Sequence, residues 1–259
     1  MVVRQSPRLD VLVRIQEAAL IKTHIMEERE LLEMNIADTI IERPVGFKIG
    51  SQQFYLYPPT LGMTYHLTGL FKSLEADARL VSTNPYLEAI RLCTEKKEVV
   101  CRILSNFTFN RKEDVFDSVK IETRTKEFSE LEVEELATMF TIVLSGDNTE
   151  EFIKHFGIDK ERLERNRIAA VKKDNSSITF GGNSTYGTLI DFACQRYGWT
   201  MEYVTWGISY ANLKMLMADA ITTIYLSEDE RKLLGKGAGE VINADDPKNR
   251  ELVREMIRE

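Results

Sequence analysis

Residues 184–226 constrain the fold of this chain most, because they carry its longest helical pattern of apolar and aromatic side chains and both of its tryptophans. Apolar residues recur there three and four positions apart, which is the spacing of one face of an α-helix. Residues that favour helix ends divide the segment. The predicted helices cover residues 186–197 (ended by Gly198), 200–206 (begun by Thr200) and 209–226 (begun by Ser209).

The helix predicted for residues 209–226 is apolar over most of its circumference, with Asn212 and Asp219 on one narrow polar strip. A helix of this kind is buried on several sides or contacts a partner. It is not expected to cross a membrane, because Asn212, Lys214 and Asp219 interrupt a run that is already short for a bilayer. The same apolar surface predicts self-association of the protein.

The chain has 259 residues, of which 43% are hydrophobic and 29% are charged. This composition is typical of soluble globular proteins. The net charge of −7 argues against nucleic-acid binding as a main function. The three cysteines, Cys93, Cys101 and Cys194, are scattered and are predicted to be free thiols in a reducing compartment. The first residues lack the apolar core of a secretory signal, so a cytoplasmic location is expected.

The fold class predicted is mostly α, with one small β-hairpin in the N-terminal part and an aromatic-rich helical C-terminal part. The hairpin is expected at about residues 45–57, where Phe47 and Ile49, then Phe54 and Leu56, alternate with polar residues around Gly50. The first helix is an arm that docks either on its own domain or on a neighbouring subunit. Helices are predicted at residues 7–42, 61–74, 85–106, 114–121, 130–144, 149–156, 159–171, 227–235 and 248–258.

Three regions are predicted along the chain. Residues 1–172 form an α-rich domain with the N-terminal arm and the hairpin. Residues 173–183 are polar and rich in glycine and serine, which is typical of a linker. Residues 184–259 form the aromatic-rich helical region.

The residue patterns of metal sites and of nucleophilic catalysis do not occur in this sequence. His24, His66 and His155 lie in three separate segments without a second metal ligand at a usable spacing. Cys93 and Cys101 fall inside a predicted core helix, where thiols are normally inert. The sequence therefore predicts no metal, no cofactor and no catalytic residue.

The aromatic residues of the C-terminal part have two interpretations. They form the core of a helical domain, or they anchor a protein partner, since tryptophan and tyrosine dominate the energetics of interfaces. Stacking on single-stranded nucleic acid needs interleaved positive charge, and only Arg196 and Lys214 lie near. The candidate partner-binding residues are Tyr197, Trp199, Tyr203, Trp206, Tyr210, Leu213 and Met217.

The aromatic pattern Tyr197-Gly198-Trp199, Tyr203, Trp206 and Ile208 resembles a helical segment of tail proteins from long-tailed bacteriophages and related mobile elements. The segment that contains the predicted hairpin and residues 58–62 (PPTLG) resembles segments of phage tail assembly chaperones. That resemblance implies a non-enzymatic protein that binds the tape-measure protein and keeps it soluble while tail tube subunits are recruited. The alternatives are a structural subunit of a phage tail or related particle and, second, a helical enzyme.

Overall fold

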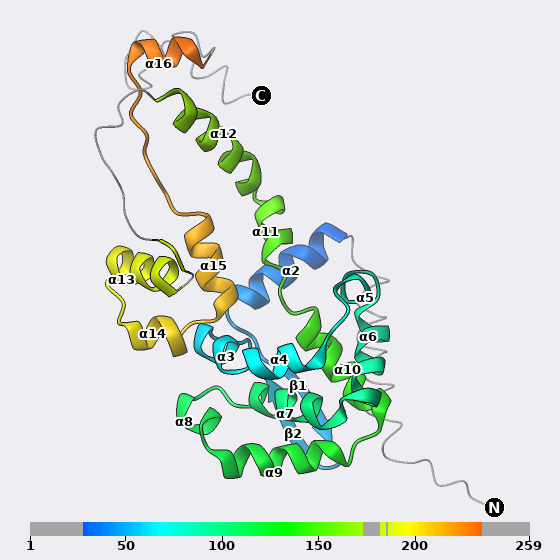
Figure 1. Cartoon of the computed structure of the whole chain (residues 1–259). Coiled ribbons are helices and arrows are strands. Elements are labelled where there is room, and N and C mark those ends of the chain that lie inside the picture. Colours follow the sequence, from blue (N-terminus) through cyan, green and yellow to red (C-terminus); the bar gives the residue numbers. More distant parts are fainter. Residues whose placement is uncertain (1–27, 173–181, 185, 235–259) are drawn as a thin grey trace, which may run out of the picture. The chain divides into compact units, whose positions relative to one another are not determined.

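The fold is known from a computed structural model that describes residues 28–172, 182–184 and 186–234 (Figure 1). Among these residues 69% are helical, and the only strands form one two-stranded sheet, so the predicted mostly α fold with a single hairpin is confirmed. The chain divides into two compact units. Of the described residues, 28–156, 182–184 and 186–219 form the first unit, and 157–172 and 220–234 form the second.

The first unit holds the hairpin and most of the helices. Its elements in chain order are α2 (Glu28–Ile40), β1 (Val45–Ile49), β2 (Gln52–Leu56), α3 (Leu61–His66), α4 (Thr68–Leu74), α5 (Ala78–Thr83), α6 (Pro85–Glu95), α7 (Lys97–Phe107), α8 (Lys112–Val115), α9 (Ser118–Ser129), α10 (Val133–Leu144), α11 (Thr149–His155), a π-helical turn η1 (Tyr186–Ile190), α13 (Asp191–Tyr197), α14 (Met201–Trp206) and α15 (Tyr210–Ala218).

The second unit contains α12 (Ile158–Val171) and α16 (Glu228–Leu233). The hydroxyl of Ser227 accepts a hydrogen bond from the N–H of Glu230 and begins α16, as predicted. Within this unit Arg167 donates a hydrogen bond to the carbonyl of Leu234 at 3.2 Å. The predicted helix at 248–258, and residues 7–27 of the N-terminal arm, lie outside the described residues.

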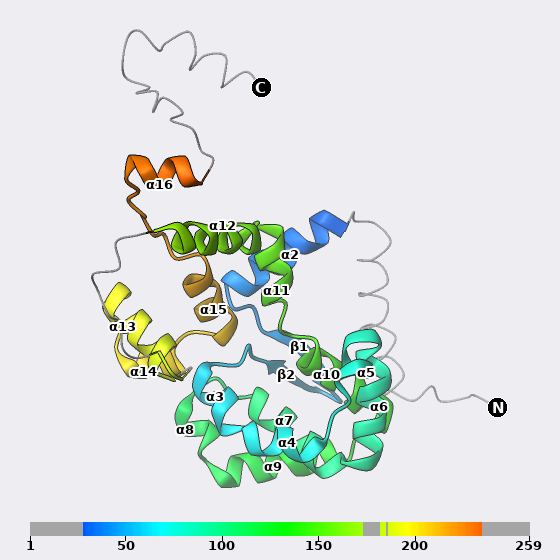
Figure 2. The same ribbon diagram turned by 45° about the horizontal axis from the view of Figure 1, so that its top comes forward.

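One face of the hairpin packs on the main hydrophobic core, to which α7, α9 and α10 also contribute (Figures 1 and 2). Gly50 takes a φ of +58° at the first position of the two-residue loop, where a glycine is the residue that adopts this conformation without strain. Phe47 and Phe54 stack with ring centroids 5.6 Å apart and both contact the ring of Phe128 on α9. Sheet and helices therefore share one apolar interior.

Residues 85–106 were predicted as one helix, and this prediction is wrong at Lys96. There the chain leaves helical geometry (φ −130°, ψ 34°) and separates α6 from α7. The break lets the two helices bury their apolar faces against different partners, since α6 packs on α10 and α7 packs on α9. Cys93 and Cys101 thus lie on different helices, and both are buried free thiols.

Other helix boundaries were also misplaced. The predicted helix at 61–74 is divided at Leu67 into α3 and α4, and α5 was not predicted at all. The segment predicted at 114–121 contains the end of α8 and the start of α9. Asp117 accepts hydrogen bonds from the N–H groups of Val119 and Lys120, and so begins a new helix that continues to Ser129.

Helix ends in the aromatic segment lie where the sequence predicts them, except the last. Gly198 ends α13 with a φ of 66°, and the hydroxyls of Thr200 and Ser209 cap α14 and α15. The helix predicted to reach residue 226 instead ends at Ala218. Four consecutive β-branched residues, 221–224 (ITTI), follow shortly, and β-branched side chains lose rotamer freedom in a helix.

The aromatic helices pack on N-terminal elements, although residues 1–172 and residues 184–259 were predicted as separate regions. Thr60 and Ser209 form an isolated antiparallel bridge, and the N–H of Tyr210 donates to the carbonyl of Pro59 at 2.8 Å. Lys112 on α8 pairs with Glu202 on α14 at 2.9 Å. The described residues from Tyr186 to Ala218 therefore belong to the same compact unit as the hairpin. Most of the predicted linker, residues 173–181, lies outside the described residues.

Candidate partner-binding site

Four aromatic side chains of α13, α14 and the turn between them contact one another in sequence, and we call Phe192, Tyr197, Trp199 and Tyr203 the aromatic surface. The ring centroids are 6.0 Å apart for Phe192 and Tyr197, 4.7 Å for Tyr197 and Trp199, and 5.1 Å for Trp199 and Tyr203. Tyr203 is 44% exposed, and the other three are half-buried. Tyrosine and tryptophan combine a large apolar area with few rotatable bonds, which suits them to anchor a partner.

The inner side of the aromatic surface rests on a small hydrophobic cluster. Tyr197 and Trp199 pack against it, as does Met217 of α15. Leu213, predicted as a partner-binding residue, is fully buried at the centre of this cluster and therefore supports the surface rather than forming part of it. The cluster consists of Leu61, Leu189, Ile190, Ala193, Val204, Ile208 and Leu213.

Trp206 does not belong to the aromatic surface. Its ring lies over Gly62 of α3, packs against the core around the hairpin and meets Phe116 edge-on at 5.5 Å. A Cβ atom added to Gly62 would lie only 2.6 Å from the Trp206 ring, so α3 and α14 approach closely because residue 62 is glycine. The position of Trp206 indicates a packing function.

Tyr210 lines a groove of about 570 Å³, which we call the α2–α15 groove. Its apolar lining includes Leu56 of β2, Phe107 of α7 and Val143 of α10. Two ion pairs lie among its polar lining residues, Asp38 with Arg43 at 3.1 Å and Asp147 with Lys214. A concave apolar site with a few fixed polar groups is the usual form of a binding pocket.

The Asp147–Lys214 pair is fixed by several contacts. Partial burial would raise the pKa of Asp147, but hydrogen bonds from Lys214 and Thr149 outweigh it and hold this pKa below its ordinary value. Lys214 also lies 4.9 Å from the ring centroid of Tyr210, within range of a cation–π interaction. Asp147 is therefore ionised at neutral pH and remains paired with Lys214 in the lining of the groove.

Glu42 joins the end of α2 to the start of α15, and no pattern in the sequence indicated this contact. It adopts a left-handed conformation (φ 54°), which is uncommon for a residue with a side chain. Its carboxylate accepts hydrogen bonds from the N–H of Ser209 at 2.7 Å and from the amide of Asn212 at 3.0 Å. The same amide of Asn212 donates to the carbonyl of Ile40 at 3.2 Å. The end of α2 is thus joined to the start of α15.

Three observations on the part of the chain that the structure describes bear on metal binding and on thiol or histidine chemistry. No group of three potential metal ligands is found there. Burial raises the pKa of Cys93 to about 12 and that of Cys101 to about 11, so both thiols are protonated at neutral pH. His66 and His155 each contact a phenylalanine ring.

No described helix is long and apolar enough to span a bilayer. Comparisons of this chain with protein families, with curated proteins and with solved structures found no match. Among the sequence-predicted site residues, Tyr197, Trp199 and Tyr203 contact one another. Leu213 lies in the small hydrophobic cluster beneath them, against which Tyr210 and Met217 also pack, whereas Trp206 packs against the core around the hairpin.

Proposed function

We propose that this protein is a non-enzymatic, cytoplasmic chaperone of phage tail assembly that binds the tape-measure protein through its aromatic surface. The observation that carries the proposal is the continuous contact of Tyr197, Trp199 and Tyr203, with Tyr203 44% exposed. Together with the resemblance of this motif to phage tail proteins, it supports binding of an apolar helical segment. Tail tube subunits are the second class of partner in this proposal.

The rigidity of the aromatic surface supports a binding function. Trp199 is held between Tyr197 at the end of α13 and Tyr203 on α14. A partner that covers Tyr203 gains apolar burial without having to order a flexible side chain, so little conformational entropy is lost on binding. A long apolar helix, such as a tape-measure segment, would be protected from aggregation by this contact.

We expect Tyr203→Ala to weaken binding of the tape-measure protein by about 2 kcal/mol, the usual size of an interface anchor, or about 30-fold. The stability of the free protein should change by less than about 1 kcal/mol, because exposed side chains contribute little to folding. Co-expression and co-purification measure the first effect, and urea unfolding measures the second.

The matched control for this experiment is Tyr86→Ala. Tyr86 is 36% exposed but lies on α6, away from the aromatic surface, so its replacement should leave binding unchanged. Equal binding by the wild type and Tyr203→Ala would remove the aromatic surface as the binding site. Recovery of the protein at high copy number in purified particles would favour a structural subunit instead.

Self-association remains a prediction, although its original basis, a long apolar helix at 209–226, is absent. The described residues do expose Ile40 and Ile41 at 64% and 59% next to the α2–α15 groove, and exposed apolar neighbours favour association. Sedimentation velocity should show a concentration-dependent oligomer that the double variant Ile40→Ser, Ile41→Ser weakens. A wild-type monomer at every concentration would contradict this prediction.

A further inference from the structure

The two strands of the hairpin leave two outer edges, and the register defines which residues face them. Ile49 pairs with Gln52 across the two-residue loop, and the pairing continues to Val45 with Leu56. In an antiparallel pair, residues alternate between bonding to the opposite strand and directing their backbone groups outward. Because the pair next to a two-residue loop is hydrogen-bonded, Gln53 and Tyr55 direct their N–H and C=O groups away from β1.

Tyr57 supports this assignment, since it has the same parity as Gln53 and Tyr55. Its N–H donates outward to the carbonyl of Phe107, at the end of α7, at 2.8 Å. Within the part of the chain that the structure describes, no group accepts a hydrogen bond from the N–H of Gln53 or Tyr55. The outer edge of β2 therefore offers an unpaired segment that begins where the contact with α7 ends.

The two edges of the hairpin differ in how they are protected. The outer edge of β1 carries Lys48, and an edge lysine is a common device against pairing with another strand. The outer edge of β2 carries the uncharged residues Gln53 and Tyr55. Only the edge of β1 is therefore protected by a charged residue of its own strand.

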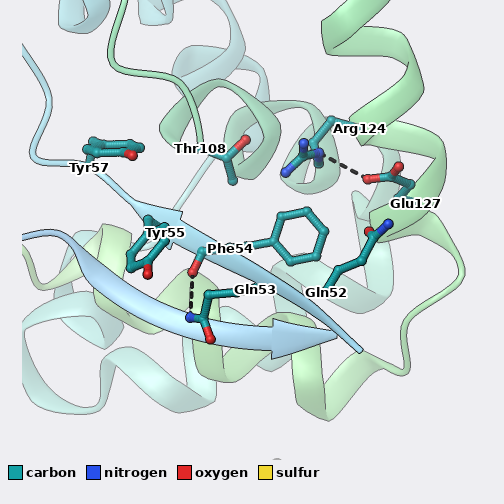
Figure 3. A pocket seen from close by; sticks show the side chains of 8 residues that line it. All are labelled: Gln52, Gln53, Phe54, Tyr55, Tyr57, Thr108, Arg124 and Glu127. Atoms are coloured by element: carbon teal, nitrogen blue, oxygen red, sulfur yellow. Dashed lines mark hydrogen bonds and ion pairs between the residues drawn. The ribbon is translucent and has the colours of Figure 1, made fainter. Parts of the chain in front are cut away.

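A hollow of about 450 Å³ follows the edge of β2. Figure 3 shows its far wall, where Arg124 and Glu127 of α9 face Phe54 and Gln52. The guanidinium of Arg124 lies 4.3 Å from the ring centroid of Phe54, and its Nε is 3.0 Å from a carboxylate oxygen of Glu127. The wall is thus fixed, and its two charges are paired with each other.

We propose that the outer edge of β2 is a strand-addition site, which binds an extended, uncharged segment of a partner polypeptide. The added strand would pair with the backbone of Gln53 and Tyr55, as in other cases of β-augmentation. One face of the segment would meet Phe54 and Arg124. The other would meet the rings of Tyr55 and Tyr57, whose centroids are 6.4 Å apart. This site is separate from the aromatic surface and does not depend on the proposed function.

The position of α9 prevents a second copy of the protein from pairing with the edge of β2 but leaves room for a single extended segment. Phe128 of α9 packs on the core face of the hairpin, and Arg124 and Glu127 extend along the edge of β2. If two copies paired through their β2 edges, the two-fold axis would lie perpendicular to the sheet. Both copies of α9 would then lie on the same face and meet each other. An isolated extended segment has no such helix.

The probe is an mRNA-displayed library of random peptides of about 10 residues, longer than a typical strand of about 5. The full chain is the bait. The decisive variant is Tyr55→Pro, which removes the outward N–H without breaking a bond to β1, since proline is tolerated at such edge positions. Lys48→Pro is the matched control, because it makes the same change on the opposite edge. Tyr55→Ala separates the backbone from the side chain.

Selected peptides should bind the wild type, Lys48→Pro and Tyr203→Ala equally, and Tyr55→Pro about tenfold or more weakly, with Tyr55→Ala affected less. Hydrogen exchange of the wild-type complex should show protection of the Gln53 and Tyr55 amides, a readout that needs no variant to fold. The proposal is overturned if no peptide is enriched, if enriched peptides bind Tyr55→Pro as well as the wild type, or if the protected amides lie elsewhere.

Discussion

Trp206→Ala is expected to lower the free energy of unfolding by about 3 kcal/mol, near the lower end of the range for aromatic residues in cores. The ring is half-buried, packs against the core around the hairpin and lies directly over Gly62. Its loss leaves a void between α3 and α14. Urea unfolding, followed by far-UV circular dichroism, measures the change.

The substitution Gly62→Ala tests the same contact from the other side. In the wild type, the new methyl group would lie 2.6 to 2.8 Å from three atoms of the Trp206 ring, so overpacking should cost about 1–3 kcal/mol. In the Trp206→Ala background that space is empty. There the substitution should stabilise the helix by about 0.5–1 kcal/mol, because alanine is the better helix former. An equal cost in both backgrounds would show that the two residues do not interact.

Local chemistry explains which parts of this fold could be predicted from the sequence. Thr60, Asn84, Thr200, Ser209 and Ser227 all cap helices where the sequence placed a helix start. Each of these interactions spans only three residues, so neighbouring residues suffice to reveal it. The hairpin could be predicted for the same reason, because its loop and its alternating pattern are local.

The parts that could not be predicted depend on contacts between distant residues. Glu42 and Ser209 are 167 positions apart, and their hydrogen bond joins segments that the sequence assigns to different regions. The break at Lys96 reflects the different packing partners of α6 and α7. Trp199 and Trp206 lie within one short segment, yet they pack on different hydrophobic clusters. Helical periodicity identifies an apolar face but does not identify what covers it.

Glu88→Ala is expected to destabilise the protein by about 3 kcal/mol, the usual cost of breaking a buried ion pair. The carboxylate of Glu88 is fully buried in α6. It accepts hydrogen bonds from Nε of Arg91 at 2.9 Å, from Nη2 of Arg91 at 2.6 Å and from the N–H of Asp77 at 2.8 Å. The pair therefore joins the start of α5 to α6, and its loss leaves the amide of Asp77 without its acceptor and removes the buried partner of Arg91.

The pH dependence of the free energy of unfolding distinguishes the contribution of the Glu88 charge from that of its side-chain packing. Hydrogen bonds from Arg91 hold the pKa of Glu88 below its ordinary value of 4.5, despite the opposing effect of burial. A carboxylate with a lowered folded-state pKa contributes stability that is present above its unfolded value and is lost as the pH falls through the folded-state value. The stability difference between the wild type and Glu88→Gln should thus be largest above about pH 4.5 and narrow in more acidic solution.

Glu95→Gln is the control, because Glu95 pairs with the same arginine at 2.6 Å but its side chain is 53% exposed, so solvent screens the pair. If Glu95→Gln cost as much as Glu88→Gln across this pH range, burial of the Glu88 carboxylate would not account for its contribution to stability.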